Sequence, residues 1–438
     1  MRILLINPSS RRKFGGSEKV SSIIHPLGLA YLAAVVRKEG YGVKILDAEA
    51  LDLTDDEILK AIESYNPSVI GLGVKTPSIN MVFGLCSRIK ENFPDKIIVL
   101  GGPHPTALPN ESIENDAVDF VVMGEGEFSF LDLVRELEKK KKNFSKIQSL
   151  VFKERRKVII NPRRAPIKDL DSLPYPAYDL LPLDRYKSAD SRHEKFVSIL
   201  TSRGCPGQCL YCNKQVFGSC VVVRSAKSLI EEVEFLIKKY GFKEFHIVDD
   251  LFTINKKRVI EFCELLIKKK IKIIWKCGNG VRVGTVDLEL LQAMKSAGCY
   301  SISYGVESGN QEILNKMKKG QTLEQVEKAV SLTKRVGIEC VCFFMFGNIG
   351  ENEKTMRETI AFAKKLDPDF ALFSIMVPYP ATEVRRIIEK EGKIFETNWD
   401  NYDHVAGKAV FEHGEIKRAL VERMYKQAFK EFYFRPKY

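Results

Sequence analysis

Short apolar runs alternate with amphipathic helical patterns along most of this chain. In its first part, "RILLINP" (2–8), "GVKILDA" (42–48), "SVIGLGVKT" (68–76) and "KIIVLGG" (96–102) are each followed by a helical pattern. Strands that alternate with helices at this spacing predict a parallel sheet, because a parallel connection needs a crossover segment. We therefore expect an α/β protein whose ligand sites lie at the C-terminal edges of its strands.

The length of the chain, 438 residues, is too great for a single hydrophobic core. We expect an N-terminal doubly wound, Rossmann-like parallel sheet over residues 1–144 and a Pro- and Tyr-rich linker over 145–195. Six further strand–helix units predict a partial (β/α)6 barrel of the TIM type over 196–390. Residues 391–438 are expected to form a short helical cap.

Paired glycines follow one predicted strand of the N-terminal sheet at Gly101-Gly102. Glycine lets a ligand approach the backbone closely, although a pair of glycines can also simply begin a tight turn. No G-x-G-x-x-G motif follows the first strand, which argues against a nicotinamide cofactor.

A cluster of cysteines follows the first predicted strand of the barrel, in "TSRGCPGQCLYCNKQ" (201–215). Chemistry in such barrels belongs to the loops after the strands. The spacing Cys205-x₃-Cys209-x₂-Cys212 offers three thiolates to one centre, whereas structural zinc normally takes four ligands. Three thiolates suit an iron–sulfur cluster with one open iron, and zinc completed by a distant histidine is the alternative. The other seven cysteines are read as small buried hydrophobes.

The cysteine motif followed by six strand–helix repeats resembles the radical S-adenosylmethionine (SAM) superfamily. The resemblance implies a [4Fe–4S] cluster on Cys205, Cys209 and Cys212, which binds SAM through its open iron and is catalytic in its cleavage. The residues that the resemblance predicts to contact SAM follow the barrel strands; they are Tyr211, Asp249, Asp250, Arg282, Glu307, Ser308, Gly347, Gly350 and Pro378.

The N-terminal part, with "HPLGLAYLAAVVRKEGYGVKILDAE", "GGPHPTALPNES" and "VDFVVMGEGE", resembles the cobalamin-binding domain fused to one branch of that superfamily. This branch includes C-methyltransferases and the anaerobic magnesium-protoporphyrin monomethyl ester cyclase. The predicted cobalamin contacts are Asn7, Pro8, Gly28, Thr76, Gly101, Gly102, His104, Gly124, Glu125, Gly126 and Glu127. The Asp-x-His-x-x-Gly motif that supplies a lower cobalt ligand elsewhere is absent. His25 and His104 are expected to make local polar contacts.

The combined resemblance implies an enzyme that methylates an unactivated carbon with SAM and cobalamin. Two alternatives stay open: a cobalamin-dependent radical cyclase or oxidoreductase without net methyl transfer, and a non-catalytic cobalamin or redox sensor. The implied partners are a one-electron reductant of the flavodoxin or ferredoxin type and a small-molecule or lipid substrate. The "FYFRPKY" ending (432–438) resembles the same branch.

The sequence has no apolar run long enough to span a bilayer and no export signal, so we expect a cytoplasmic protein. Its formal net charge of +12 comes largely from lysines scattered on helix faces. These lysines indicate a solvated surface, and contact with a membrane surface is an open alternative. No interleaved basic and aromatic motif predicts nucleic-acid binding.

Overall fold

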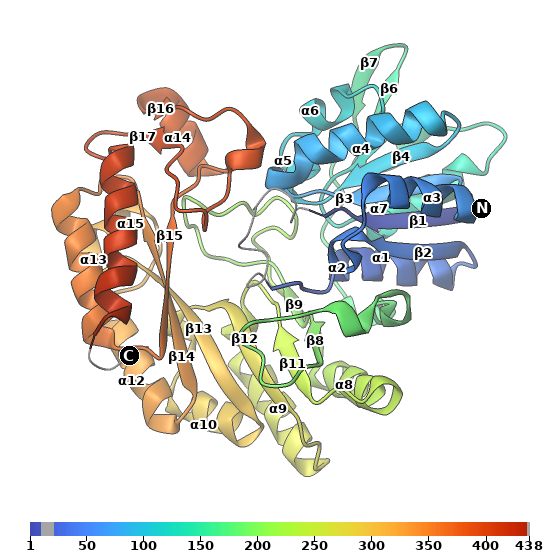
Figure 1. Ribbon diagram of the computed structural model, residues 1–438. Helices are drawn as coiled ribbons and strands as arrows, with labels where there is room; N and C mark the ends of the chain where they lie inside the picture. Colours follow the sequence, from blue (N-terminus) through green and yellow to red (C-terminus); the bar gives the residue numbers. More distant parts are fainter. Residues whose placement is uncertain (10–21, 436–438) are drawn as a thin grey trace. The chain divides into compact units, whose positions relative to one another are not determined.

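The structure is a computed structural model that describes residues 1–9 and 22–435, so the last three residues of the "FYFRPKY" motif lie outside the described residues. The chain divides into two compact units (Figure 1). The N-terminal unit comprises residues 1–196 and 215–218, and the C-terminal unit comprises residues 197–214 and 219–438.

The described part of the N-terminal unit forms a seven-stranded sheet in the order β2-β1-β3-β4-β5-β6-β7. The first five strands pair in parallel, as the alternating pattern predicts, and β6 and β7 add an antiparallel hairpin. We predicted this hairpin, but placed it in the linker; the structure instead shows it continuing the N-terminal sheet. The helices and strands of this unit are β1 (Arg2–Asn7), α1 (Leu27–Lys38), β2 (Gly42–Asp47), α2 (Ala48–Leu51), α3 (Asp55–Tyr65), β3 (Val69–Gly73), α4 (Ile79–Asn92), β4 (Ile97–Gly101), α5 (Pro103–Ala107), α6 (Pro109–Glu114), β5 (Phe120–Val122), α7 (Glu127–Leu137), β6 (Leu150–Glu154) and β7 (Lys157–Ile160).

The strand order of the N-terminal unit creates a switch point between β1 and β3, where the chain changes the direction in which it adds strands. Ligands of open parallel sheets bind outside the carboxyl ends of the strands at such a point. The central strands are apolar on both faces, with Ile3 and Ile70 fully buried, because helices cover the sheet on both sides.

The C-terminal unit contains a six-stranded sheet in the order β8-β11-β12-β13-β14-β15. This sequential order is that of the predicted partial barrel, and β8 and β15 are its two open edges. The helices between the strands cover its outer face (Figure 1). The elements of the sheet and of these helices are β8 (Phe196–Ile199), α8 (Ala226–Tyr240), β11 (Glu244–Ile247), α9 (Lys256–Lys268), β12 (Ile274–Val281), α10 (Leu288–Ser296), β13 (Cys299–Glu307), α11 (Gln311–Lys316), α12 (Leu323–Val336), β14 (Glu339–Phe346), α13 (Glu353–Leu366) and β15 (Phe370–Ile375).

Two short antiparallel pairs accompany this sheet. Strand β9 (Ser202–Arg203) pairs with β10 (Val222–Val223), so the ends of the segment that carries the cysteines are joined. Strand β16 (Lys393–Ile394) pairs with β17 (Phe411–Glu412) after helix α14 (Glu383–Glu391).

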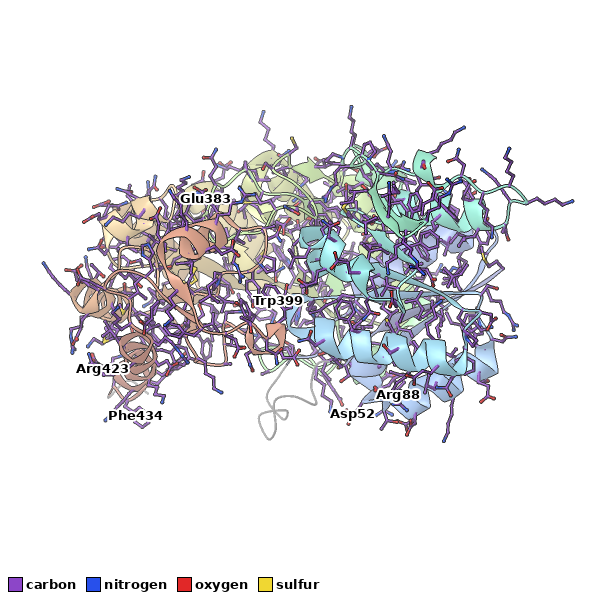
Figure 2. All side chains as sticks on the ribbon, turned by 90° about the horizontal axis from the view of Figure 1, so that it is seen from above. Asp52, Arg88, Glu383, Trp399, Arg423 and Phe434 are labelled. Atoms are coloured by element: carbon purple, nitrogen blue, oxygen red, sulfur yellow. The ribbon has the colours of Figure 1, made fainter. Side chains whose placement is uncertain are left out.

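The C-terminal segment ends in helix α15 (Arg418–Tyr433), which packs on the outer side of edge strand β15. The ring of Phe373 lies 5.2 Å from that of Phe429 and 6.1 Å from that of Phe432. Arg423 on α15 forms an ion pair with Glu353, and both it and the 86% exposed Phe434 lie at the surface (Figure 2).

No helix within residues 1–9 and 22–435 is both long and apolar enough to cross a membrane.

Candidate active site

The loop that carries the cysteines begins at the end of β9, and two aspartates hold its start in place through hydrogen bonds. Asp249 accepts hydrogen bonds from the backbone amide of Thr201 at 2.6 Å and from the hydroxyl of Ser202 at 2.6 Å. Asp250 accepts one from the backbone amide of Gly204 at 2.9 Å. Both aspartates follow β11, so these bonds tie the start of the loop to the neighbouring strand.

These bonds bear on the predicted SAM contacts of Asp249 and Asp250. Asp249 is buried, and Arg258 lies 4.0 Å from its carboxylate, so its oxygens are already engaged within the protein. A buried carboxylate that accepts several hydrogen bonds is a structural anchor. Contact of either aspartate with SAM stays a prediction.

The three thiols of the loop provide an all-sulfur donor set. In the part of the chain that the structure describes, no three His, Cys, Asp or Glu side chains are close enough to hold a single metal ion. Zinc needs its ligands to converge on one ion, whereas a four-iron cluster takes each thiolate on a separate iron. Desolvation and repulsion from Cys209 and Cys205 raise the pKa of the Cys212 thiol to about 11. The thiolate form therefore needs a cationic metal partner, and the donor set fits a cluster.

Arg282, at the end of β12, reaches across to the cysteine loop. One of its guanidinium nitrogens, Nη1, lies 3.9 Å from Sγ of Cys209, and the other, Nη2, donates to the carbonyls of Lys319 and Gly320. A Cβ atom on Gly207 would lie 2.6 Å from Nη1 of Arg282, so a side chain there would displace the guanidinium.

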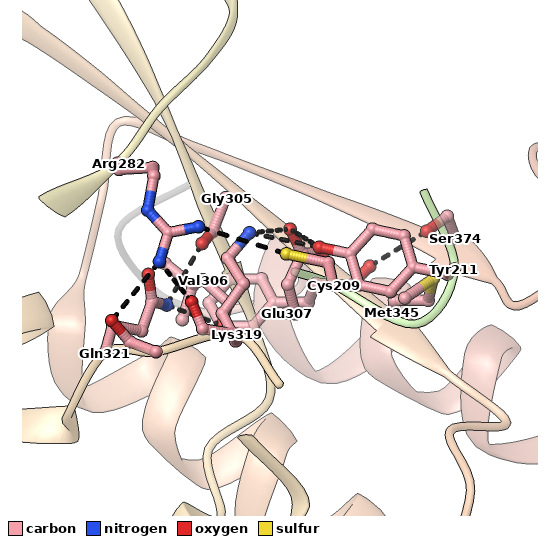
Figure 3. A network of polar contacts seen from close by, with 12 residues as sticks. Cys209, Tyr211, Arg282, Gly305, Val306, Glu307, Lys319, Gln321, Met345 and Ser374 are labelled. Atoms are coloured by element: carbon pink, nitrogen blue, oxygen red, sulfur yellow. Dashed lines mark hydrogen bonds and ion pairs between the residues drawn. The ribbon is translucent and has the colours of Figure 1, made fainter. Parts of the chain in front are cut away.

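Lys319 is a residue of the candidate site that the sequence analysis missed. Its buried ammonium lies 2.7 Å from Oε1 of Glu307 and 3.1 Å from the hydroxyl of Tyr211, which itself lies 3.1 Å from the same carboxylate oxygen (Figure 3). A Cβ atom on Gly305 would lie 2.6 Å from Oε1 of Glu307, so glycine makes room for the network. "NKMKKGQ" (315–321) looks like an exposed lysine run, and only the glycine that follows Lys319 hinted at a turn.

Gln321 completes this network from below. Its amide nitrogen donates to the carbonyls of Gly305 and Val306, at 3.1 and 3.2 Å (Figure 3). Glu307 itself adopts a positive φ of 68°, which a non-glycine residue accepts only when its surroundings hold it there. The structure thus brings together Tyr211, Glu307, Arg282 and Cys209.

The other predicted SAM contacts lie on neighbouring strand ends. Ser308 is fully buried, and its hydroxyl lies 3.2 Å from that of Thr359. Gly347 and Gly350 both have positive φ and flank a turn after β14. Pro378 is buried after β15. Their contact with SAM stays a prediction.

The turn after β14 is organised by Glu351. This carboxylate accepts from the backbone amides of Gly347 at 2.7 Å and Asn348 at 2.8 Å. Burial raises the pKa of Glu351 to about 7. The sequence pattern did not single out this residue.

The predicted cobalamin contacts gather at the C-terminal strand edge of the N-terminal unit. Asn7 ends β1 and donates to Asp47, and Thr76 follows β3, so both flank the switch point. Gly102, after β4, has a φ of 105°, and a Cβ atom there would lie 2.8 Å from the carbonyl oxygen of Val74. Gly28 is the second residue of α1, and a Cβ atom there would meet nothing within 4 Å.

The remaining cobalamin candidates are partly engaged within the unit. His104 is buried, with Nδ1 3.3 Å from the hydroxyl of Thr76 and Nε2 3.5 Å from Glu111. Glu125 accepts from the backbone amide of Ile167 at 2.7 Å. The other members of the set are Pro8 after β1, Gly101 at the end of β4, Gly124 and Gly126 between β5 and α7, and Glu127 at the start of α7.

His25 packs against Tyr186, with ring centroids 4.0 Å apart and the rings tilted by 31°, and Tyr186 in turn donates to Asp47. The half-buried Gly101 and Gly102 at these strand ends carry no side chain, which fits the close approach of a large flat ligand such as a corrin.

Comparison with known proteins agrees with this geometry. The model of the B12 binding domain matches residues 16–134, and that of the radical SAM superfamily matches residues 199–363. An uncharacterized methyltransferase of Pyrococcus horikoshii is 35% identical over 100% of this chain and 93% of its own length. The anaerobic magnesium-protoporphyrin IX monomethyl ester cyclase of Rubrivivax gelatinosus is 30% identical over 92% of this chain and 72% of its own length.

Among solved structures, the radical SAM methyltransferase TsrM from Kitasatospora setae, with cobalamin and a [4Fe–4S] cluster bound, has the same fold. Its TM-score is 0.76 at 18% identity, and the match covers 100% of this chain and 89% of that one. The fold and the cysteine loop define a radical SAM enzyme. The chain belongs to the family of radical SAM enzymes that carry a B12-binding domain, and its cofactors are a [4Fe–4S] cluster, SAM and cobalamin.

Proposed function

We propose that this enzyme transfers a methyl group from SAM to an unactivated carbon of its substrate. The observation that carries the proposal is the pairing, in one chain, of a three-sulfur loop with a corrin-binding sheet. The similarity to a relative named as a methyltransferase, over the whole length of this chain, supports the same reaction.

When bound, the cluster supplies the electron that splits SAM into methionine and a deoxyadenosyl radical, and cobalamin supplies a cobalt centre that carries a methyl group. Cys205, Cys209 and Cys212 would hold the cluster. Arg282 places a positive charge beside Cys209. Lys319 fixes the side chains of Glu307 and Tyr211 next to the loop, so they meet SAM without rearranging.

This proposal includes the predicted contacts with SAM and with cobalamin. It also includes the four predicted domain ranges, which are 1–144, 145–195, 196–390 and 391–438. Radical SAM enzymes need a source of electrons, and we propose a flavodoxin- or ferredoxin-type donor. All ten cysteines are free thiols, and such a chain with a reduced cluster suits the cytoplasm. The proposed substrate is a small molecule or a lipid.

The test uses the enzyme reconstituted anaerobically with iron, sulfide and cobalamin. It is incubated with a chemical reductant, SAM carrying a deuterated methyl group, and fractions of a cell extract. Mass spectrometry should find the deuterated methyl group in an organic product, together with 5′-deoxyadenosine. Absence of 5′-deoxyadenosine under every condition would instead indicate a sensor.

A second candidate function is a radical cyclisation or oxidation without net methyl transfer. The similarity to the magnesium-protoporphyrin cyclase over 92% of this chain favours it. The same experiment separates the two reactions, because a cyclase would form 5′-deoxyadenosine and a product without deuterium.

A further inference from the structure

The inner face of edge strand β15 exposes large apolar side chains. Phe370 is 47% exposed and Leu372 is 50% exposed, whereas Ala371, Phe373 and Ile375 between and beyond them are buried. Phe373 packs against α15, so the buried set points to the outer helix layer. Since side chains alternate along a strand, Phe370 and Leu372 point to the opposite, inner face of the partial barrel.

Exposure on this face departs from the usual state of a parallel sheet. Parallel strands are normally covered on both faces, because their crossover helices and neighbouring layers bury them. The free energy cost of leaving two large apolar side chains in water is substantial, and contiguous exposed apolar surface marks a binding site.

The neighbouring strand carries apolar residues on the same face, of which Val341 is buried and Phe343 is half-buried. In the register of β14 with β15, Val341 lies opposite Phe370, and Phe343 lies opposite Leu372. A Cβ atom on Gly280 would lie 3.6 Å from the ring of Phe343, so this glycine of β12, two strands away in the sheet, faces Phe343. We call Val341, Phe343, Phe370 and Leu372 the apolar inner face.

The apolar inner face leads directly to the candidate active site. The next pair in the register is Met345 opposite Ser374. Met345 belongs to the buried cluster that includes Leu210, and Tyr211 packs against that cluster. Figure 3 shows Met345 and Ser374 beside Tyr211, next to Cys209 and the Lys319 network. The inward-facing residues of β14 and β15 therefore follow one another from Val341 and Phe370 to the buried Met345, which lies beside Tyr211.

We propose that the apolar inner face binds the hydrocarbon body of the substrate, whose reacting carbon lies at the Tyr211 end. From Phe370 to Ser374 the strand rises about 13 Å at about 3.3 Å per residue, which selects an elongated, hydrocarbon-rich molecule. The choice of reaction at that carbon rests on the proposed function, but the binding surface does not require turnover.

The test measures binding of radiolabelled farnesol, an uncharged alcohol with a long hydrocarbon chain, to the reconstituted enzyme by anaerobic equilibrium dialysis without SAM or reductant. Two variants alter the surface. One is a double variant that combines Phe370→Ser with Leu372→Ser, and the other is Leu372→Met alone, which is the conservative change. Ile267→Ser is the matched control, because Ile267 is 51% exposed on α9. Cluster content and circular dichroism report whether each variant is folded.

We expect saturable binding that unlabelled dodecanol displaces and ribose does not. The double variant should bind at least tenfold more weakly, while Leu372→Met and Ile267→Ser should bind like the wild type. Each tenfold loss corresponds to about 1.4 kcal/mol. Unsaturable binding to the wild type, or equal binding by the double variant, would overturn the proposal.

Two further outcomes separate this inference from its alternatives. Light scattering could show that the wild type is a dimer and that the double variant is a monomer. This result would assign the surface to a second copy of the chain and reject the substrate role. If farnesol binds as expected but no extract fraction yields a methylated product, the binding surface stands and the proposed methyl transfer fails.

Discussion

The ammonium of Lys319 lies 2.7 Å from the carboxylate of Glu307, and both side chains are almost completely buried. Lys319 is the cation paired with this carboxylate, and it also holds the hydroxyl of Tyr211. A buried ion pair that loses one partner leaves the other charge uncompensated, which costs far more than the loss of a surface pair.

Replacing Lys319 by Met is therefore predicted to lower the free energy of unfolding by about 3 kcal/mol. The matched control is Lys318→Met, because Lys318 pairs with Glu383 at the surface and should contribute less than about 1 kcal/mol. Chemical denaturation of both variants checks this difference. Equal losses would show that Glu307 does not depend on its buried cation.

Replacing Cys209 by Ala is predicted to abolish the cluster, because the loop would then supply only two of the three thiolates that hold it. Cys220→Ala is the control, because Cys220 is an exposed free thiol in the same β9–β10 segment. Iron and sulfide per chain, with the absorbance of the reconstituted protein, measure the outcome. Full iron content in the Cys209 variant would exclude this residue as a ligand.

Replacing Gly102 by Ala is predicted to destabilise the N-terminal unit by about 2 kcal/mol or more. Its φ of 105° is unfavourable for alanine, and the new Cβ atom would lie 2.8 Å from the carbonyl oxygen of Val74. Gly84→Ala on helix α4, where the Cβ atom meets nothing within 4 Å, should instead stabilise by up to about 1 kcal/mol. Thermal unfolding and cobalamin retention measure both effects, and unchanged behaviour of the Gly102 variant would contradict this account of the turn.

The pH dependence of stability should report on Glu351. Because burial raises its pKa from 4.5 to about 7, the folded state keeps a proton that the unfolded state releases between these values. Stability is therefore lost as pH rises through this window. The unfolding free energy of the wild type minus that of Glu351→Gln should therefore decrease by about 3 kcal/mol between pH 4 and pH 8. Denaturation of the cluster-free protein at both pH values measures it, and a difference independent of pH would refute the shift.

Much of the architecture followed from periodicity alone. Alternating strands and helices predicted both parallel sheets, and the position of Cys205 after a strand predicted a loop at the C-terminal edge. These features are local, because each depends on a few consecutive residues. The hairpin of β6 and β7 was also visible, but its attachment to the N-terminal sheet depends on pairing between strands distant in sequence.

The site was harder to predict, because burial depends on tertiary packing. Lys319 stands in a lysine run that looks exposed, and only the fold brings it to Glu307. Asp249 looked available to a ligand, yet its oxygens accept bonds from Thr201 and Ser202. Sequence motifs identify which residues are near the chemistry, but they do not distinguish a residue that meets the ligand from one that supports it.

The pairing of β9 with β10 has a consequence for the lifetime of the enzyme. A loop clamped at both ends has already lost much of its conformational entropy before iron arrives. If oxygen destroys the cluster, the three thiols stay near the positions in which they bind it, because the paired ends of the loop limit its motion. Repair then requires fresh iron and sulfide, and little refolding.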